Sequence, residues 1–122
     1  MKKAILIFSV LLMGSTGFAQ NKNTKATIEV DGVCGMCKHR IEKASIQAKG
    51  VKSAIWDVDT HELKLIYNES KTDLTKIQQS IADSGHDTQD IKAKDAVYES
   101  IDPCCLYRDQ KIIDDHKDDD HH

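Results

Sequence analysis

Three short stretches of this chain alternate hydrophobic and polar residues, the pattern typical of strands with one buried face. They cover residues 25–30, 51–58 and 62–67, and the short turn 59–61 joins the last two into a hairpin. The side chains expected to face the core are Ile28, Val30, Ala54, Trp56, Val58, Leu63, Leu65 and Tyr67.

Two further stretches repeat hydrophobic residues at steps of three and four, which predicts helices. The first starts at Cys37 and stops before Gly50, and the second runs from residue 74 to Gly85. Residues 88–93 read as a weak last strand. The order strand, helix, strand, strand, helix, strand predicts an α+β, ferredoxin-like βαββαβ sandwich, with two helices on one face of a four-stranded antiparallel sheet.

The first 19 residues have the pattern of an export signal. Lys2 and Lys3 precede an apolar run of ten residues, which is too short for a stable membrane span. Small residues then favour cleavage near Ala19–Gln20. This predicts a periplasmic or secreted protein without a stable membrane anchor after signal cleavage.

The remaining sequence divides into three parts. Residues 25–93 form the predicted domain, and residues 94–113 form a C-terminal extension in which 94–101 could make a short helix. Residues 114–122 are rich in Asp and His and are predicted to be disordered. The formal net charge is −3 and no basic stripe is present, so nucleic acid is not an expected partner.

Four cysteines fall into two pairs, and the first pair lies where the first strand gives way to the first helix. Cys34 and Cys37 are separated by two residues, so both sulfurs can reach one ion. Thiolates are soft ligands that suit Cu(I), Zn(II) and similar metals. A helix start also offers free N–H groups, which favour thiolates and lower the pKa of both cysteines.

This order of elements, with Cys-x-x-Cys after the first strand, resembles the heavy-metal-associated domain family of copper chaperones, copper-transporting P-type ATPases and periplasmic mercury-binding proteins. Gly50-Val51 and Ser84-Gly85 also stand at matching places. The family usually has Gly-Met-x-Cys-x-x-Cys, whereas Gly32-Val33-Cys34 is one residue shorter and lacks the methionine that packs beneath the site. Val33 or Met36 is expected to occupy that space.

The resemblance implies a soft-metal-binding protein rather than an enzyme. Cu(I) is the expected ion, and Hg(II), Zn(II), Cd(II) or Ag(I) are alternatives. The protein would act as a chaperone or scavenger and pass its ion by thiolate exchange to a metal-transporting ATPase, an efflux system or another chaperone. The resemblance also places His86 near the ion, as a further ligand or as a hydrogen-bond donor beside it.

The second cysteine pair and the tail leave several alternatives open. Cys104 and Cys105 could join the first site, bind a second ion, pair with other chains or form disulfides. His116, His121 and His122 could bind metal in the acidic tail. Two other functions also remain: a thiol–disulfide oxidoreductase, and a structural exported domain stapled by disulfides.

Overall fold

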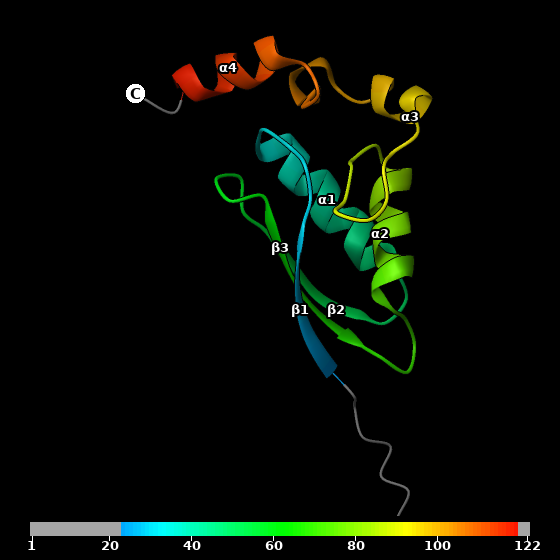
Figure 1. The fold of residues 1–122 in the computed structure, drawn as a ribbon. Helices are drawn as coiled ribbons and strands as arrows, with labels where there is room; N and C mark the ends of the chain where they lie inside the picture. Colours follow the sequence, from blue (N-terminus) through cyan, green and yellow to red (C-terminus); the bar gives the residue numbers. More distant parts are fainter. Residues whose placement is uncertain (1–22, 120–122) are drawn as a thin grey trace, which may run out of the picture.

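A three-stranded antiparallel sheet forms the base of the protein. The computed structural model describes residues 23–119, and the predicted signal and cleavage site lie outside them. The strands are β1 (Asn23–Glu29), β2 (Val51–Trp56) and β3 (Glu62–Asn68), and β3 lies in the centre. The hairpin of β2 and β3 was predicted, and β1 pairs with the far edge of β3 (Figure 1).

One face of this sheet carries the hydrophobic core. The alternation predicted in β3 is confirmed, because Leu63, Leu65 and Tyr67 are buried while their neighbours Glu62 and Lys64 are exposed. The expectation for Val58 is wrong. Strand β2 ends at Trp56, and the carboxylate of Asp57 accepts hydrogen bonds from the next turn, which leaves Val58 in an exposed loop.

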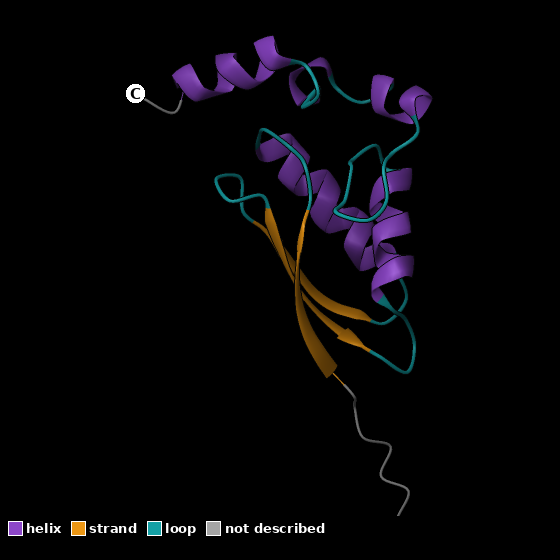
Figure 2. Cartoon of the chain, viewed as in Figure 1, coloured by secondary structure: helices purple, strands orange, loops and turns teal. Residues whose placement is uncertain are grey.

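Helices α1 (Gly35–Gln47) and α2 (Leu74–Asp83) lie side by side on that face of the sheet, as predicted (Figure 2). Buried Cys37, Ile41 and Ala44 line the inner side of α1. The α+β architecture is therefore confirmed, and Cys37 is fixed to the core by its own helix face.

The predicted fourth strand is wrong for the described residues. Only Thr88 pairs with the sheet, through an isolated antiparallel bridge to Val30. Side chains bond the backbone groups that would otherwise pair with a neighbouring strand. The hydroxyl of Thr88 bonds both the N–H and the C=O of Ile91, and the side-chain oxygen of Gln78 accepts from the N–H of Asp90. Local bonds of this kind compete with sheet formation.

The C-terminal extension folds back over one end of the domain. It contains α3 (Asp95–Glu99) and a 3₁₀ turn (Pro103–Cys105), and α4 (Gln110–Asp119) runs from its end into the tail. Helix α3 matches the short helix predicted there. Helix α4 differs from the predicted disorder after residue 114, because Gln110 bonds Asp114 one turn on and His116 bonds the carbonyl of Cys104. None of the described helices is long and apolar enough to cross a membrane.

Candidate metal centre

Cys34 and Cys37 lie together at the start of α1. Cys34 is the N-cap residue, with an extended backbone and no side-chain cap bond, so its sulfur is free for other contacts. The Sγ atoms of Cys34 and Cys37 are 3.4 Å apart. Cys37 is fully buried and Cys34 is partly exposed, which places the pair at the boundary between core and solvent.

The extension brings the second cysteine pair to the first. Cys105 Sγ lies 3.3 Å from Cys34 Sγ, and Cys104 Sγ lies 3.9 Å from Cys105 Sγ. Among the described residues, the sulfurs of Cys34, Cys104 and Cys105 form a group within 4.8 Å of one another. All four cysteines are free thiols in this structure, so neither pair forms a disulfide staple here.

The thiols differ in how readily they ionise. Burial raises the pKa of Cys34. The backbone N–H of Cys37 and the adjoining thiols of Cys105 and Cys37 lower it by more than burial raises it, so the pKa of Cys34 ends below the ordinary thiol value. Burial dominates at Cys37 and raises its pKa, contrary to the expectation that the helix start lowers both. Burial and the neighbouring thiols also raise the pKa of Cys105. Cys34 is therefore the thiol best prepared to meet an ion as thiolate.

Trp56 supports the loop from below. Its indole ring is 1% exposed and packs against Gly32, and its Nε1–H donates to the carbonyl of Val30 at 2.9 Å. Met36 does not take this place, because its side chain is 50% exposed, and Val33 is only partly buried. The indole therefore packs beneath the shortened loop, where Val33 or Met36 was expected.

We expect Gly32→Ala to lower the free energy of unfolding by about 2 kcal/mol, because it overpacks this contact. A methyl carbon at Gly32 would lie 2.9 Å from the Trp56 ring and 3.0 Å from the Cβ of Cys37. Gly35→Ala is the matched control, since nothing lies within 4 Å of a methyl group there. Urea unfolding of reduced, metal-free protein measures both variants. Equal stability of the two would contradict the close packing of the loop on Trp56.

His86 is fully buried, and its two ring nitrogens bond groups other than the thiols. Its Nδ1 lies 2.8 Å from the carbonyl of Asp31, and its Nε2 lies 3.4 Å from the guanidinium of Arg40. Arg40 also lies near the thiol of Cys105, which together with Asp102 raises the pKa of its guanidinium. Burial lowers the pKa of His86 to about 4, which keeps its ring neutral at pH 7. A neutral ring with Nδ1–H donating to Asp31 fits this geometry.

His116, one of the predicted tail ligands, lies at the edge of the same region. Its Nε2 lies 2.8 Å from the carbonyl of Cys104. Its ring also lines a cavity of about 520 Å³ between α4 and the β2–β3 turn, together with His61. His121 and His122 lie outside the described residues.

Three residues that sequence reasoning did not single out organise the site: Arg40, Tyr107 and Arg108. Arg40 stands three residues after Cys37, so helical spacing alone places it on a neighbouring face. Tyr107 and Arg108 closely follow the cysteine pair, but their partners at 85–87 are distant in the sequence. No local pattern reveals that contact.

The fold and its thiols together define a small α+β domain of the soft-metal-binding class. The chain belongs to the heavy-metal-associated domain family, whose profile matches residues 27–87. The matched stretch contains Cys34, Cys37 and His86. It ends before Cys104 and Cys105, so the extension is an addition to the part that the family shares. The family is one of metal-binding domains and not of enzymes.

Relatives of known name agree with this assignment. The chain is 30% identical over 63 residues to the copper chaperone CopZ of Staphylococcus haemolyticus, covering 51% of this chain and 93% of CopZ. It is 35% identical over 66 residues to a copper-exporting P-type ATPase of the same organism, covering 53% of this chain and 8% of the ATPase. A solved putative copper-ion-binding protein of Bacillus anthracis superposes with a TM-score of 0.54 at 27% identity, covering 57% of this chain and 99% of that one.

Proposed function

We propose that this protein is an exported copper-trafficking protein that binds Cu(I) through Cys34 and Cys37. The observation that carries the proposal is the 3.4 Å approach of these two sulfurs at the start of α1. Cu(I) prefers thiolate ligands, and two of them suffice for a linear site. The copper chaperones and the copper-exporting ATPase among its relatives support this ion over Hg(II), Zn(II), Cd(II) or Ag(I).

Handover to a partner proceeds by ligand exchange. A thiolate of the partner forms a new Cu–S bond, and one resident Cu–S bond then breaks. The released cysteine takes up a proton from solvent, so copper keeps its oxidation state and no external oxidant or reductant is needed. The P-type ATPase relative supports a metal-transporting ATPase as the partner. Export rests on the signal-like residues 1–19.

Cys34→Ser is expected to weaken Cu(I) binding at least a thousandfold, because it removes the central thiol of the site. A competition titration of the reduced protein against a coloured Cu(I) chelator measures this loss. Ser45→Ala is a matched control: this hydroxyl is buried in the same helix and bonds only the carbonyl of Ile41. Tight Cu(I) binding by Cys34→Ser would refute the proposed function.

A further inference from the structure

The segment of residues 94–109, called the arm below, is anchored firmly beside the metal centre. The hydroxyl of Tyr107 donates to the carbonyl of Gly85 and accepts from the N–H of Asp87, each at 2.8 Å. The Tyr107 ring also stacks on His86, with centroids 5.2 Å apart. Tyr107, two residues after Cys105, thus holds the arm to the loop that follows α2.

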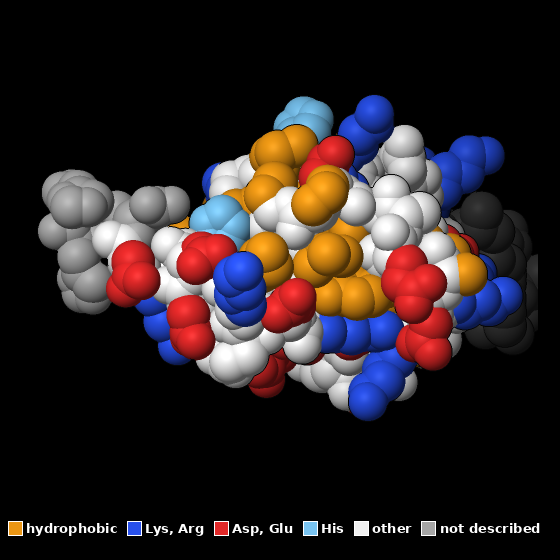
Figure 3. All heavy atoms as spheres, turned by 90° about the horizontal axis from the view of Figure 1, so that it is seen from above, with side chains coloured by type: hydrophobic (Ala, Val, Ile, Leu, Met, Phe, Trp, Pro, Cys, Tyr) orange, Lys and Arg blue, Asp and Glu red, His pale blue; other side chains and the backbone are white. Residues whose placement is uncertain are grey.

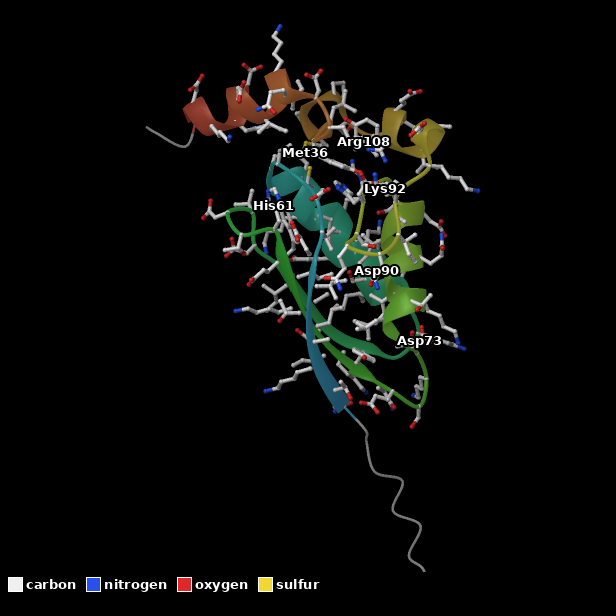
Figure 4. The ribbon with its side chains drawn as sticks, viewed as in Figure 1. Met36, His61, Asp73, Asp90, Lys92 and Arg108 are labelled. Atoms are coloured by element: carbon white, nitrogen blue, oxygen red, sulfur yellow. The ribbon has the colours of Figure 1, made fainter. Side chains whose placement is uncertain are left out.

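Arg108 adds a second anchor. Its guanidinium contacts both carboxylate oxygens of Asp87 at 2.7 and 3.1 Å, and donates to the carbonyl of Ala93. It also stacks over the Tyr98 ring at 4.3 Å. Asp87 is only 8% exposed, and a two-point Arg–carboxylate contact of this kind fixes geometry as well as charge. Figure 4 shows Arg108 at the end of the molecule where the arm crosses above Met36 and α1.

These anchors deliver Cys105 to the site as a buried thiol. Its residue is fully buried, and its sulfur lies 3.3 Å from Cys34, nearly the same as the 3.4 Å between Cys34 and Cys37. Three sulfurs bound to one ion at about 2.3 Å in a plane lie roughly 4.0 Å apart. A linear pair would need about 4.6 Å. The two distances from the Cys34 sulfur, to Cys37 and to Cys105, therefore need to lengthen less to reach the three-sulfur spacing than to reach the linear one.

The charge around Cys105 also fits a third thiolate. Cu(I) with three thiolates carries a net charge of −2, which is costly beside a buried core unless a cation compensates it. The guanidinium of Arg40 lies near the Cys105 thiol, and its Nη2 is held by the carboxylate of Asp102 at 2.6 Å. A guanidinium in this position offsets negative charge without being itself a ligand.

Cys104 lies farther out than Cys105. It is partly exposed, and its sulfur faces the sulfur of the exposed Met36 at 3.4 Å. Seen from above, hydrophobic side chains gather in the centre of this end of the molecule and charged ones surround them (Figure 3). Cys104 therefore lies on the solvent side of the cluster, while Cys105 lies on the core side with Cys37.

We infer that Cys105 is a third thiolate ligand, which the arm supplies to the ion held by Cys34 and Cys37. The inference rests on the proposed function and extends it, because the third ligand comes from outside the stretch that the family shares. A thiol tethered in the same chain acts at high effective concentration. The arm therefore tightens binding, and an incoming partner thiolate must displace Cys105 before it receives the ion.

X-ray absorption spectroscopy of the full-length protein loaded with one equivalent of Cu(I) tests this directly. Wild type is expected to show three Cu–S contacts and Cys105→Ser two. Cys104→Ser is the matched control and is expected to keep three. In chelator competition, Cys105→Ser should bind about a hundredfold more weakly than wild type, and Cys104→Ser should match wild type.

A second variant guards against misfolding of Cys105→Ser. Arg108→Met keeps all four thiols but removes the anchor to Asp87, so it should also weaken Cu(I) binding. A double variant that combines Arg108→Met with Cys105→Ser should then bind Cu(I) no more weakly than Cys105→Ser alone, because both changes remove the same ligand. Additive losses would overturn the inference, as would two Cu–S contacts in wild type or loss of the third contact in Cys104→Ser. Cys34→Ser tests the proposed function separately: weak binding there with unchanged binding in Cys105→Ser refutes only the third ligand.

Discussion

Replacing Trp56 with alanine is expected to lower the free energy of unfolding of the reduced, metal-free protein by about 4 kcal/mol. The indole is 1% exposed and is among the largest fully buried side chains of the core. Its removal leaves a cavity beneath Gly32 and takes away the hydrogen bond to the buried carbonyl of Val30. Both the lost packing and the unpaired carbonyl act in the same direction.

The backbone of Trp56 keeps its own supports in this variant, so the strand itself should survive. Glu42 accepts from the Trp56 N–H at 2.9 Å, and Lys38 donates to its carbonyl at 2.8 Å. Trp56→Phe is the matched control, because it keeps an aromatic ring but lacks the N–H donor, and should lose roughly half as much. Urea unfolding must be followed by circular dichroism, since Trp56 is the chain's single tryptophan. If Trp56→Ala lowered the free energy of unfolding by less than about 1 kcal/mol, the result would contradict the packing of the indole beneath the loop.

The strands and helices that pack on the core could be predicted because their burial follows a simple period. Leu63, Leu65 and Tyr67 alternate along β3, and Cys37, Ile41 and Ala44 recur along α1. Residues 88–93 lack such a period. Their conformation depends on the side chain of Gln78, which lies ten residues before Thr88 in the sequence. No local sequence pattern shows that Gln78 bonds Thr88 and Asp90.

The metal centre was predictable only in part for a similar reason. Cys34 and Cys37 are only three positions apart in the sequence, and this spacing indicates a metal-binding pair. The approach of Cys105 depends on the docking of Arg108 on Asp87, which joins positions 21 residues apart through tertiary structure. The packing of Trp56 on Gly32 likewise joins residues that are distant in the sequence. Sequence spacing predicts the cysteine pair at the start of α1, whereas the positions of Cys105 and Trp56 around it follow from tertiary packing.

Acidification is expected to destabilise the reduced, metal-free protein by about 3 kcal/mol between pH 7 and pH 4, through His86. Burial holds its pKa at about 4, against 6.5 for an ordinary histidine. Within that interval the unfolded chain binds a proton at His86 and the folded chain does not. The stabilisation is therefore complete above pH 6.5, is lost progressively as the pH falls to 4, and changes little below that.

The surroundings of His86 explain why its pKa is lowered. Burial is the main cause, and the guanidinium of Arg40, 3.4 Å from Nε2, adds repulsion against a second positive charge. The hydrogen bond to the carbonyl of Asp31 and the charge of Asp87 favour the protonated ring but do not outweigh burial and the charge of Arg40. Burial and the charge of Asp87 raise the pKa of Asp31. Protonation of Asp31 therefore stabilises the folded chain as the pH falls, and partly offsets the destabilisation that comes from His86.

His86→Asn isolates the contribution of the imidazole. The amide of asparagine can donate to the carbonyl of Asp31 as Nδ1 does, but it does not titrate. Urea unfolding at a series of pH values should therefore show a shallower slope between pH 6.5 and 4 in His86→Asn than in wild type. The other histidines, Asp31 and Asp87 are present in both proteins, so the difference between the two curves reports His86 alone. Parallel curves would show that His86 ionises equally in the folded and unfolded chain, and would contradict its burial between Asp31 and Arg40.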